Sequence, residues 1–171
     1  MSKVKRSIVL IGFMGTGKSS VSRLLAERLG YMRTDLDEEI ERREGRSIAS
    51  IFAGSGEPAF RELETRVLSE LLTNRKQQII ATGGGAVLSE RNRELMQEYG
   101  WVVGLKADAE QIIARVRTDS SRPLLHGDLQ ERVTRLLEER KHAYDFADLI
   151  IDTSQFSTDE VASQIIARWH G

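Results

Sequence analysis

Short apolar runs alternate along the chain with segments whose apolar residues follow a helical period. The runs are rich in β-branched residues, and each is closed by glycine, aspartate or threonine, which is typical of buried strands. Between the runs, the spacing of Val21, Leu24, Leu25 and Leu29 is typical of one helix face. The pattern predicts strands at Ser7–Ile11, Tyr31–Thr34, Gln78–Ala81, Trp101–Leu105 and Leu149–Ile151.

This alternation predicts the fold class. Five strands that alternate with helices favour an α/β fold with a parallel sheet covered by helices on both faces. The length of 171 residues is that of one domain, and no internal repeat interrupts it. Residues 117–130, with the sequence RTDSSRPLLHGDLQ, have little apolar periodicity, and we expect them to form a long mobile insertion.

The amino-acid composition argues against several classes of function. The 25 Lys and Arg residues balance 26 Asp and Glu residues, so nothing in the charge indicates a nucleic-acid or membrane partner. The chain has no cysteine, which excludes disulfides and thiolate metal sites and fits a reducing compartment. The apolar run near the N-terminus is too short for a signal peptide or a membrane span. We therefore expect a cytoplasmic protein, and the near-neutral composition favours a monomer.

Directly after the first predicted strand, Gly12–Ser19 reads GFMGTGKS and matches the pattern G-x-x-x-x-G-K-[ST] in full. Backbone N–H groups of such a loop and of the following helix bind polyphosphate. We expect Lys18 to reach the β- and γ-phosphates and the Ser19 hydroxyl to bind Mg²⁺. The alternative is a glycine-rich turn with an incidental lysine. The predicted nucleotide-binding residues of the loop are Gly12, Gly15, Thr16, Gly17, Lys18, Ser19 and Ser20.

The carboxylate that usually steadies magnesium in such proteins is absent from the end of the strand QQIIATGGG. Asp35 and Asp37 follow the second predicted strand, and in an extended segment they would share a face. Asp35 is then the candidate for the magnesium shell and Asp37 for contact with an acceptor hydroxyl. Equally, Asp37 could merely cap the helix that follows.

Glycines and arginines complete the set of candidates. The run Gly83–Gly85 after a strand indicates close approach of the backbone to a ligand, or else a plain tight turn. Arg61, Arg115 and Arg140 lie in charged helical segments, where an exposed surface role is the ordinary alternative. Arg122 lies in the polar insertion, and a loop arginine that closes over phosphates is a usual device of phosphoryl transfer.

Several motifs in order carry a resemblance over nearly the whole chain: GFMGTGKSS, DLD, GRSIASIFAGSGEPAFRELE, ATGGGAV, RPLL and ERKHAY. With them the chain resembles the shikimate kinases. The resemblance implies ATP- and Mg²⁺-dependent phosphorylation of the 3-hydroxyl of shikimate, a step of aromatic amino-acid biosynthesis. It also implies the three-layer fold of P-loop kinases of the nucleoside-monophosphate-kinase type. That fold has a five-stranded parallel sheet, a substrate-binding helical region near residues 37–65 and a mobile lid near residues 117–129.

The resemblance also assigns roles by matching position. Lys18, Asp37 and Arg122 would be catalytic, with Ser19 and Asp35 near the metal. Shikimate would lie against Asp37, Gly83, Gly84 and Gly85, with its carboxylate held by Arg61 and Arg140. Arg115 would lie against the adenine, and Arg122 would close with the lid. The segments YDFAD and TSQFST depart from the family pattern on the adenine side.

Two alternatives from other classes stay open at this point. A related kinase of gluconate or of a nucleoside monophosphate would share the P-loop and lid, but we would not expect it to pair DLD, FR and GGG. A non-catalytic binding module of the same fold is the second alternative. It is disfavoured because Lys18, Ser19, Asp35, Asp37 and Arg122 are all present.

Overall fold

The computed structural model describes residues 4–117 and 128–171. Five strands alternate with helices, and the predicted strands agree with the observed ones within one residue at each end. The elements in chain order are β1 (Ser7–Gly12), α1 (Lys18–Leu29), β2 (Met32–Asp35), α2 (Leu36–Glu44), α3 (Ile48–Thr73), β3 (Gln78–Ala81), the short 3₁₀ helix η1 (Ala86–Leu88), α4 (Glu90–Tyr99), β4 (Gly100–Lys106), α5 (Ala109–Val116), α6 (Leu129–Glu139), β5 (Leu149–Asp152) and α7 (Thr158–Arg168).

All five strands form one parallel sheet in the order β2-β3-β1-β4-β5. The central strand β1 pairs with β3 on one side and β4 on the other, with Ile8 opposite both Ile79 and Trp101. Every residue of β1 is buried. The sheet is therefore covered on both faces, as the run of apolar residues in β1 predicts, and the α/β fold class is confirmed.

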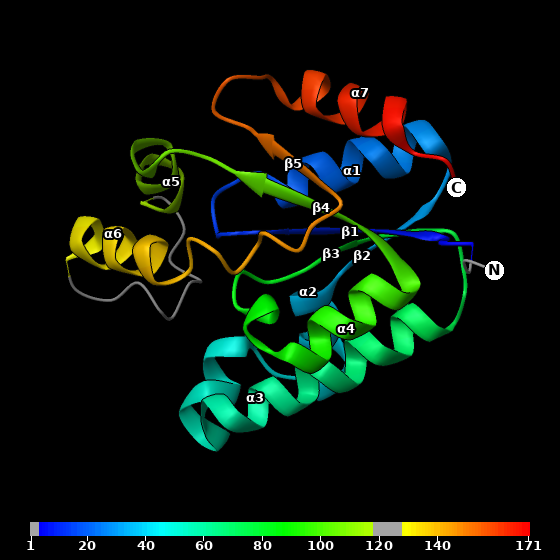
Figure 1. The fold of residues 1–171 in the computed structure, drawn as a ribbon. Coiled ribbons are helices and arrows are strands. Elements are labelled where there is room, and N and C mark those ends of the chain that lie inside the picture. The colour runs from blue at the N-terminus through cyan, green and yellow to red at the C-terminus, as the bar shows by residue number, and fades with distance from the viewer. Residues whose placement is uncertain (1–3, 118–127) are drawn as a thin grey trace.

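Successive side chains of β1 enter opposite layers of the core, as the pleat requires. Ile8 and Leu10 pack in the layer formed with α1 and α7. Val9 and Ile11 pack in the layer formed with α2, α3 and α4. Figure 1 shows these two helical layers above and below the sheet.

A third, smaller core lies beyond the carboxyl ends of β1 and β4. Phe13 and Met14 of the loop after β1 pack there against Ile112 of α5 and Val133 of α6. In Figure 1, α5 and α6 stand together at this end of the sheet. The predicted insertion is shorter than expected at its C-terminal end, because Asp128 caps α6 and the helix begins at Leu129.

Helix α3 contains a break that matters for the site. Gly56 has φ +83°, a conformation that favours glycine, and Pro58 follows at the start of the second segment. The second segment carries Phe60, Arg61 and Glu64 toward the carboxyl end of the sheet. Over residues 4–117 and 128–171, no helix is long and apolar enough to cross a membrane.

Candidate active site

The loop between β1 and α1 leaves the N-terminus of a helix open to a ligand. Gly17 precedes α1 with φ +98° and supplies no side-chain cap. The first N–H groups of a helix have no partner inside the helix, and they bind anions well. The predicted phosphate loop therefore has the backbone geometry that polyphosphate binding needs.

Three side chains hold this loop in shape. The Lys18 ammonium donates to the carbonyl oxygens of Gly12 (2.6 Å) and Phe13 (2.8 Å). The buried Thr16 hydroxyl donates to the Phe13 carbonyl at 2.7 Å, so this side chain is engaged within the loop. Arg115 donates from Nη1 to the Gly15 carbonyl at 2.7 Å. Arg115 thus lies on the loop itself, and its predicted contact with adenine stays a prediction.

One pocket collects most of the predicted phosphate and metal residues. Its lining residues come from the loop, from the start of α1, from the end of β2 and the first turn of α2, from the residue after β3 and from α5. They are Gly15, Gly17, Lys18, Ser19, Ser20, Asp35, Asp37, Thr82, Arg115 and Val116. Gly12 and Thr16 do not line it. We refer to it as the phosphate pocket.

The structure corrects the local interpretation of the two aspartates. Asp35, not Asp37, caps helix α2: its Oδ1 accepts the Glu38 N–H at 3.1 Å, and its Oδ2 lies 3.9 Å from Arg33 Nη2. The helix begins at Leu36, so Asp37 lies in its first turn. The two side chains do not share the face of an extended segment, yet both line the phosphate pocket.

A second pocket adjoins the first and holds the predicted acceptor residues together. Met14, Ile48, Phe52 and Phe60 supply its apolar wall. The polar and backbone lining comes from Asp37, Arg61, Glu64, Gly83, Gly84, Gly85 and Arg140. We refer to it as the acceptor pocket. Asp37 lines both pockets, so its carboxylate stands where they meet.

The three glycines of the acceptor pocket lie directly against its charged groups. A Cβ atom added to Gly83 would lie 3.0 Å from Asp37 Oδ1, and one added to Gly85 would lie 2.3 Å from Arg61 Nη2. At Gly84 the added atom would be 3.7 Å from Arg140 Nη1. The run therefore lets charged side chains approach the backbone, and it is more than a plain tight turn.

Arg61 is held by two carboxylates of its own helix. Its Nη1 donates to Glu64 Oε1 at 2.8 Å, and its Nη2 donates to Glu57 Oε1 at 3.4 Å. Glu64 is 1% exposed. Burial raises the pKa of Glu64 to about 7, while the attraction of Arg61 works in the opposite direction. Arg61 thus lies in the wall of the acceptor pocket and not on a fully solvated helix face, and its predicted contact with the substrate stays a prediction.

Arg140 lies immediately after α6 and is 6% exposed. Its guanidinium stands over the Phe13 ring at 5.8 Å, and no described residue accepts a hydrogen bond from its buried Nη1. Buried guanidinium groups require anionic or carbonyl partners. An unpartnered, buried donor beside Gly84 is therefore a strong indication of an anionic ligand.

The fit of a magnesium ion can be tested on the phosphate pocket. In the described ranges, no three carboxylate or imidazole side chains form a group that could hold a metal by themselves. Mg²⁺ is usually bound by one or two protein oxygens together with substrate phosphates and water. Ser19 and Asp35 line the same pocket as the loop, and this donor set fits such an ion.

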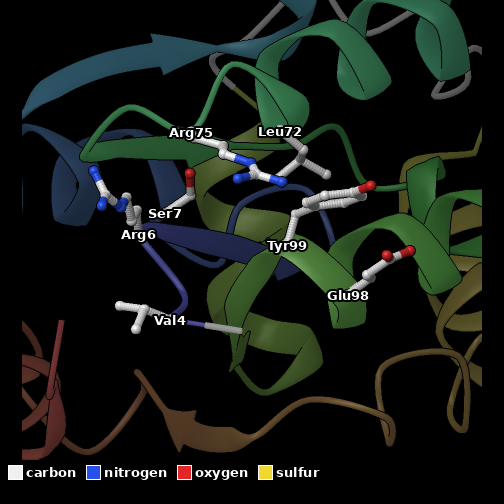
Figure 2. A pocket seen from close by; sticks show the side chains of 7 residues that line it. All are labelled: Val4, Arg6, Ser7, Leu72, Arg75, Glu98 and Tyr99. Carbon is white, nitrogen blue, oxygen red and sulfur yellow. The ribbon is translucent and has the colours of Figure 1, made fainter. Parts of the chain in front are cut away.

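A separate pocket lies at the opposite end of β1. Figure 2 shows its lining, which combines apolar and polar side chains from the start of β1, the end of α3 and the end of α4. Ligands of open parallel sheets bind outside the carboxyl ends of the strands, whereas this pocket includes Ser7 at the amino end of β1. We therefore place the candidate active site at the phosphate and acceptor pockets.

Comparison with known proteins agrees with this site. The sequence model of the family described as shikimate kinase matches residues 14–170. A shikimate kinase of Geobacter metallireducens is 45% identical over 167 residues, which cover 97% of this chain and 93% of that protein. One of Geobacter sulfurreducens is 48% identical over 161 residues, or 94% and 88% of the two chains. The chain belongs to the shikimate kinase family.

A solved structure supports the same assignment. The shikimate kinase of Acinetobacter baumannii, in complex with shikimate, superposes with a TM-score of 0.90 at 41% identity. The match covers 95% of this chain and 92% of that one. The P-loop kinase fold is thereby confirmed. As a member of the shikimate kinase family, this chain is a kinase that uses ATP.

Within this family site, sequence reasoning missed two polar residues. Glu64 follows Arg61 by three positions, a spacing that places both on one helix face, and that signal was present in PAFRELE. Tyr144 donates from its hydroxyl to the Gly84 carbonyl at 2.8 Å. No local pattern could pair residues 60 positions apart. Arg122 and most of the predicted lid lie outside the described residues.

Proposed function

We propose that this chain transfers the γ-phosphoryl group of ATP to the 3-hydroxyl of shikimate, and that Asp37 orients that hydroxyl. The position of Asp37 carries the proposal, because this one carboxylate lines the phosphate pocket and the acceptor pocket. Phosphoryl transfer requires the acceptor hydroxyl to lie next to the γ-phosphate, and a carboxylate that lines both pockets stands at that point.

The acceptor pocket suits a small anion with hydroxyl groups. Arg61 and Arg140 bind its carboxylate, since planar guanidinium groups bind carboxylates through paired, charge-assisted hydrogen bonds. The buried Nη1 of Arg140 gains an acceptor in this way. Backbone at Gly83–Gly85 closes the pocket around the ring, and Asp37 faces the 3-hydroxyl.

The phosphate pocket holds the nucleotide. Backbone N–H groups of Gly15, Gly17 and the start of α1 bind the phosphates, and Lys18 reaches the β- and γ-phosphates. Ser19 and, in the outer shell, Asp35 would hold Mg²⁺. When bound, the ion would neutralise charge on the phosphate oxygens. Arg115, which lies on the loop, would also lie against the adenine, and Arg122 would close over the nucleotide with the lid.

In the transfer step, the 3-hydroxyl oxygen forms a bond to the γ-phosphorus. The bond from that phosphorus to the β–γ bridging oxygen breaks, and ADP leaves with the electron pair. As the oxygen attacks, the hydroxyl gives up its proton along the hydrogen bond to Asp37, and the proton is then released to solvent. Lys18 stabilises the negative charge that develops on the bridging and γ-oxygens.

The proposal also covers the organisation of the chain. Residues 1–171 form one kinase domain, with the acceptor-binding region at about residues 37–65 and the lid at about residues 117–129. Helix α2 and both segments of α3 supply Asp37, Arg61 and Glu64, which supports this division. The enzyme would act as a cytoplasmic monomer, without nucleic-acid or membrane partners.

An acceptor panel tests the proposal. ADP formation is measured with ATP and Mg²⁺ in the presence of shikimate, gluconate or a nucleoside monophosphate, with an assay lacking acceptor as the control. We expect turnover with shikimate and only background with the other two. Higher kcat/KM for gluconate or a nucleoside monophosphate would contradict the proposed acceptor, and ATP turnover with none of them would contradict a kinase of this class.

A further inference from the structure

Glu64 is a buried acid that the proposed transfer step does not use. It lies on the second segment of α3, at the wall of the acceptor pocket. Its Oε1 accepts a hydrogen bond from Arg61 at 2.8 Å. Within residues 4–117 and 128–171, no group donates to its buried Oε2. One oxygen of the carboxylate is thus paired, and the other is enclosed without a donor.

The charges around Glu64 are balanced before any ligand enters. Arg61 and Arg140 face it as cations, and Asp37 of α2 faces it as a second carboxylate. Glu57, which is half-exposed, contacts Nη2 of the Arg61 guanidinium, whereas Glu64 contacts Nη1. The glycine run opposite carries no titratable side chain. A substrate carboxylate would therefore be an additional anion beside two guanidinium groups that already have carboxylate neighbours.

Adding that anion disturbs the balance in two ways. The incoming carboxylate takes hydrogen bonds of Arg61 on which ionised Glu64 depends, and it repels the charge of Glu64 directly. A buried carboxylate that loses its compensation either pays a large desolvation cost or becomes protonated. Oε2 is available to carry the proton, and a protonated carboxyl group becomes a hydrogen-bond donor.

We infer that Glu64 takes up a proton from solvent when the acceptor's carboxylate binds to Arg61 and Arg140, so that acceptor binding is coupled to pH. The inference rests on the proposed function, since it assumes that a carboxylate occupies this pocket. The proton comes from water or buffer, and no covalent bond other than O–H is formed.

The direction of the pH dependence follows from the ionisation of the free protein. Burial already raises the pKa of Glu64 to about 7, and a bound anion raises it further. Below this pKa, Glu64 is protonated in both states and affinity is independent of pH. Above it, binding requires uptake of a proton, so affinity falls by up to about tenfold per pH unit until the pKa of the complex is reached.

Titration calorimetry measures the proton uptake that accompanies binding. Shikimate is titrated into the full chain at pH 8 in Tris and in HEPES, whose ionisation enthalpies differ. Shikimate is fully ionised at this pH, so its own carboxyl contributes nothing. We expect a difference between the two apparent enthalpies that corresponds to uptake of roughly half a proton or more. Equal enthalpies in both buffers would overturn the inference.

Variants assign the proton to a residue. In Glu64→Gln the enthalpy should become independent of buffer, and affinity should no longer fall between pH 7 and pH 9. Glu57→Gln is the matched control, because it removes the exposed partner of the same arginine, and it should keep the wild-type uptake. Asp37→Asn should keep it as well. Loss of uptake in Asp37→Asn but not in Glu64→Gln would assign the proton to Asp37 and overturn the inference.

The same experiment separates the inference from the proposed function. Absence of any binding heat together with absence of turnover on shikimate would contradict the proposed function itself. Binding with equal enthalpies in both buffers would leave that function intact and overturn only proton uptake by Glu64. If Glu64→Gln does not fold, the wild-type titrations in the two buffers still test whether a proton is taken up. The Asp37→Asn titrations then test whether Asp37 is the group that takes it up.

Discussion

The two pockets that meet at Asp37 are built in different ways. Half of the residues that line the phosphate pocket come from one contiguous segment, the loop after β1 and the first turn of α1, and this segment offers backbone N–H groups to a ligand. The acceptor pocket is assembled from α2, α3, the loop after β3, the residue after α6 and Met14 of the loop after β1, and its polar side chains are charged.

This difference has energetic consequences. The loop can bind phosphates with donors that any backbone supplies, provided that glycine allows its shape. In the acceptor pocket, Arg61, Glu64 and Arg140 are buried or half-buried charges that depend on one another and on the ligand. Substitutions in the loop should therefore affect nucleotide chemistry, whereas substitutions in the acceptor pocket should affect recognition of one substrate.

Lys18→Met should give the largest loss. Lys18 is the one cation of the contiguous loop Gly12–Ser19, and it stabilises charge that develops during transfer. Removing one such preorganised contact typically lowers the rate by roughly 10²–10³-fold. We expect a fall of that size in kcat, measured by ADP release with saturating shikimate.

The control for Lys18→Met is the folded state. Lys18 also donates to two carbonyl oxygens of the resting loop, so circular dichroism and thermal melting must accompany the kinetics. A folded variant that keeps more than about a tenth of the wild-type kcat would remove Lys18 from the mechanism.

Arg61→Lys tests the other side of the comparison. The charge is kept but the planar guanidinium is lost, and a charge-assisted hydrogen bond contributes about 1.5–3 kcal/mol. We expect the KM for shikimate to rise about tenfold or more while the KM for ATP stays nearly unchanged.

Arg66→Lys is the matched control for Arg61→Lys, because Arg66 lies on the same helix with a side chain that is 64% exposed. It should change neither KM. A rise in both KM values in Arg61→Lys, or in neither, would contradict the division into two pockets.

Gly85→Ala should have a smaller effect of the same kind. The added methyl group would lie 2.3 Å from Arg61 Nη2, so the end of a flexible side chain must move. A displacement that costs about 1 kcal/mol raises the KM for shikimate roughly fivefold. Steady-state kinetics with ATP as the internal reference checks this, and an unchanged KM for shikimate would show that Arg61 does not need this space.

The sequence predicts the contiguous region well. Alternation of apolar runs with helical periods is enough to place all five strands, because a buried parallel strand has few alternatives for such residues. The loop motif likewise predicts its own geometry, since the glycines and Lys18 act on their immediate neighbours in the chain.

The assembled region is predicted less completely. Asp35 and Asp37 were expected to share an extended face, but Asp35 caps α2 and the chain becomes helical at Leu36. Sequence spacing cannot show which of two nearby aspartates becomes the cap. Tyr144 reaches Gly84 only through the tertiary fold, and Glu64 is buried on the segment of α3 that follows the break at Gly56.

The central claim is that Asp37 joins the two pockets in one reaction, and Asp37→Asn tests it most directly. The measurement is the single-turnover rate of shikimate phosphorylation at saturating ATP and shikimate, beside the melting temperature. Asp37 does not cap α2, so its charge contributes at most about 1 kcal/mol to stability as an acid in the first helical turn. Glu38→Gln is the control, because it removes a charge from the same turn with a side chain that is 63% exposed.

The account predicts a fall of roughly 10²-fold in the single-turnover rate of Asp37→Asn, with nearly unchanged melting temperature and with full activity in Glu38→Gln. A stable Asp37→Asn variant that phosphorylates shikimate at nearly the wild-type rate would contradict it.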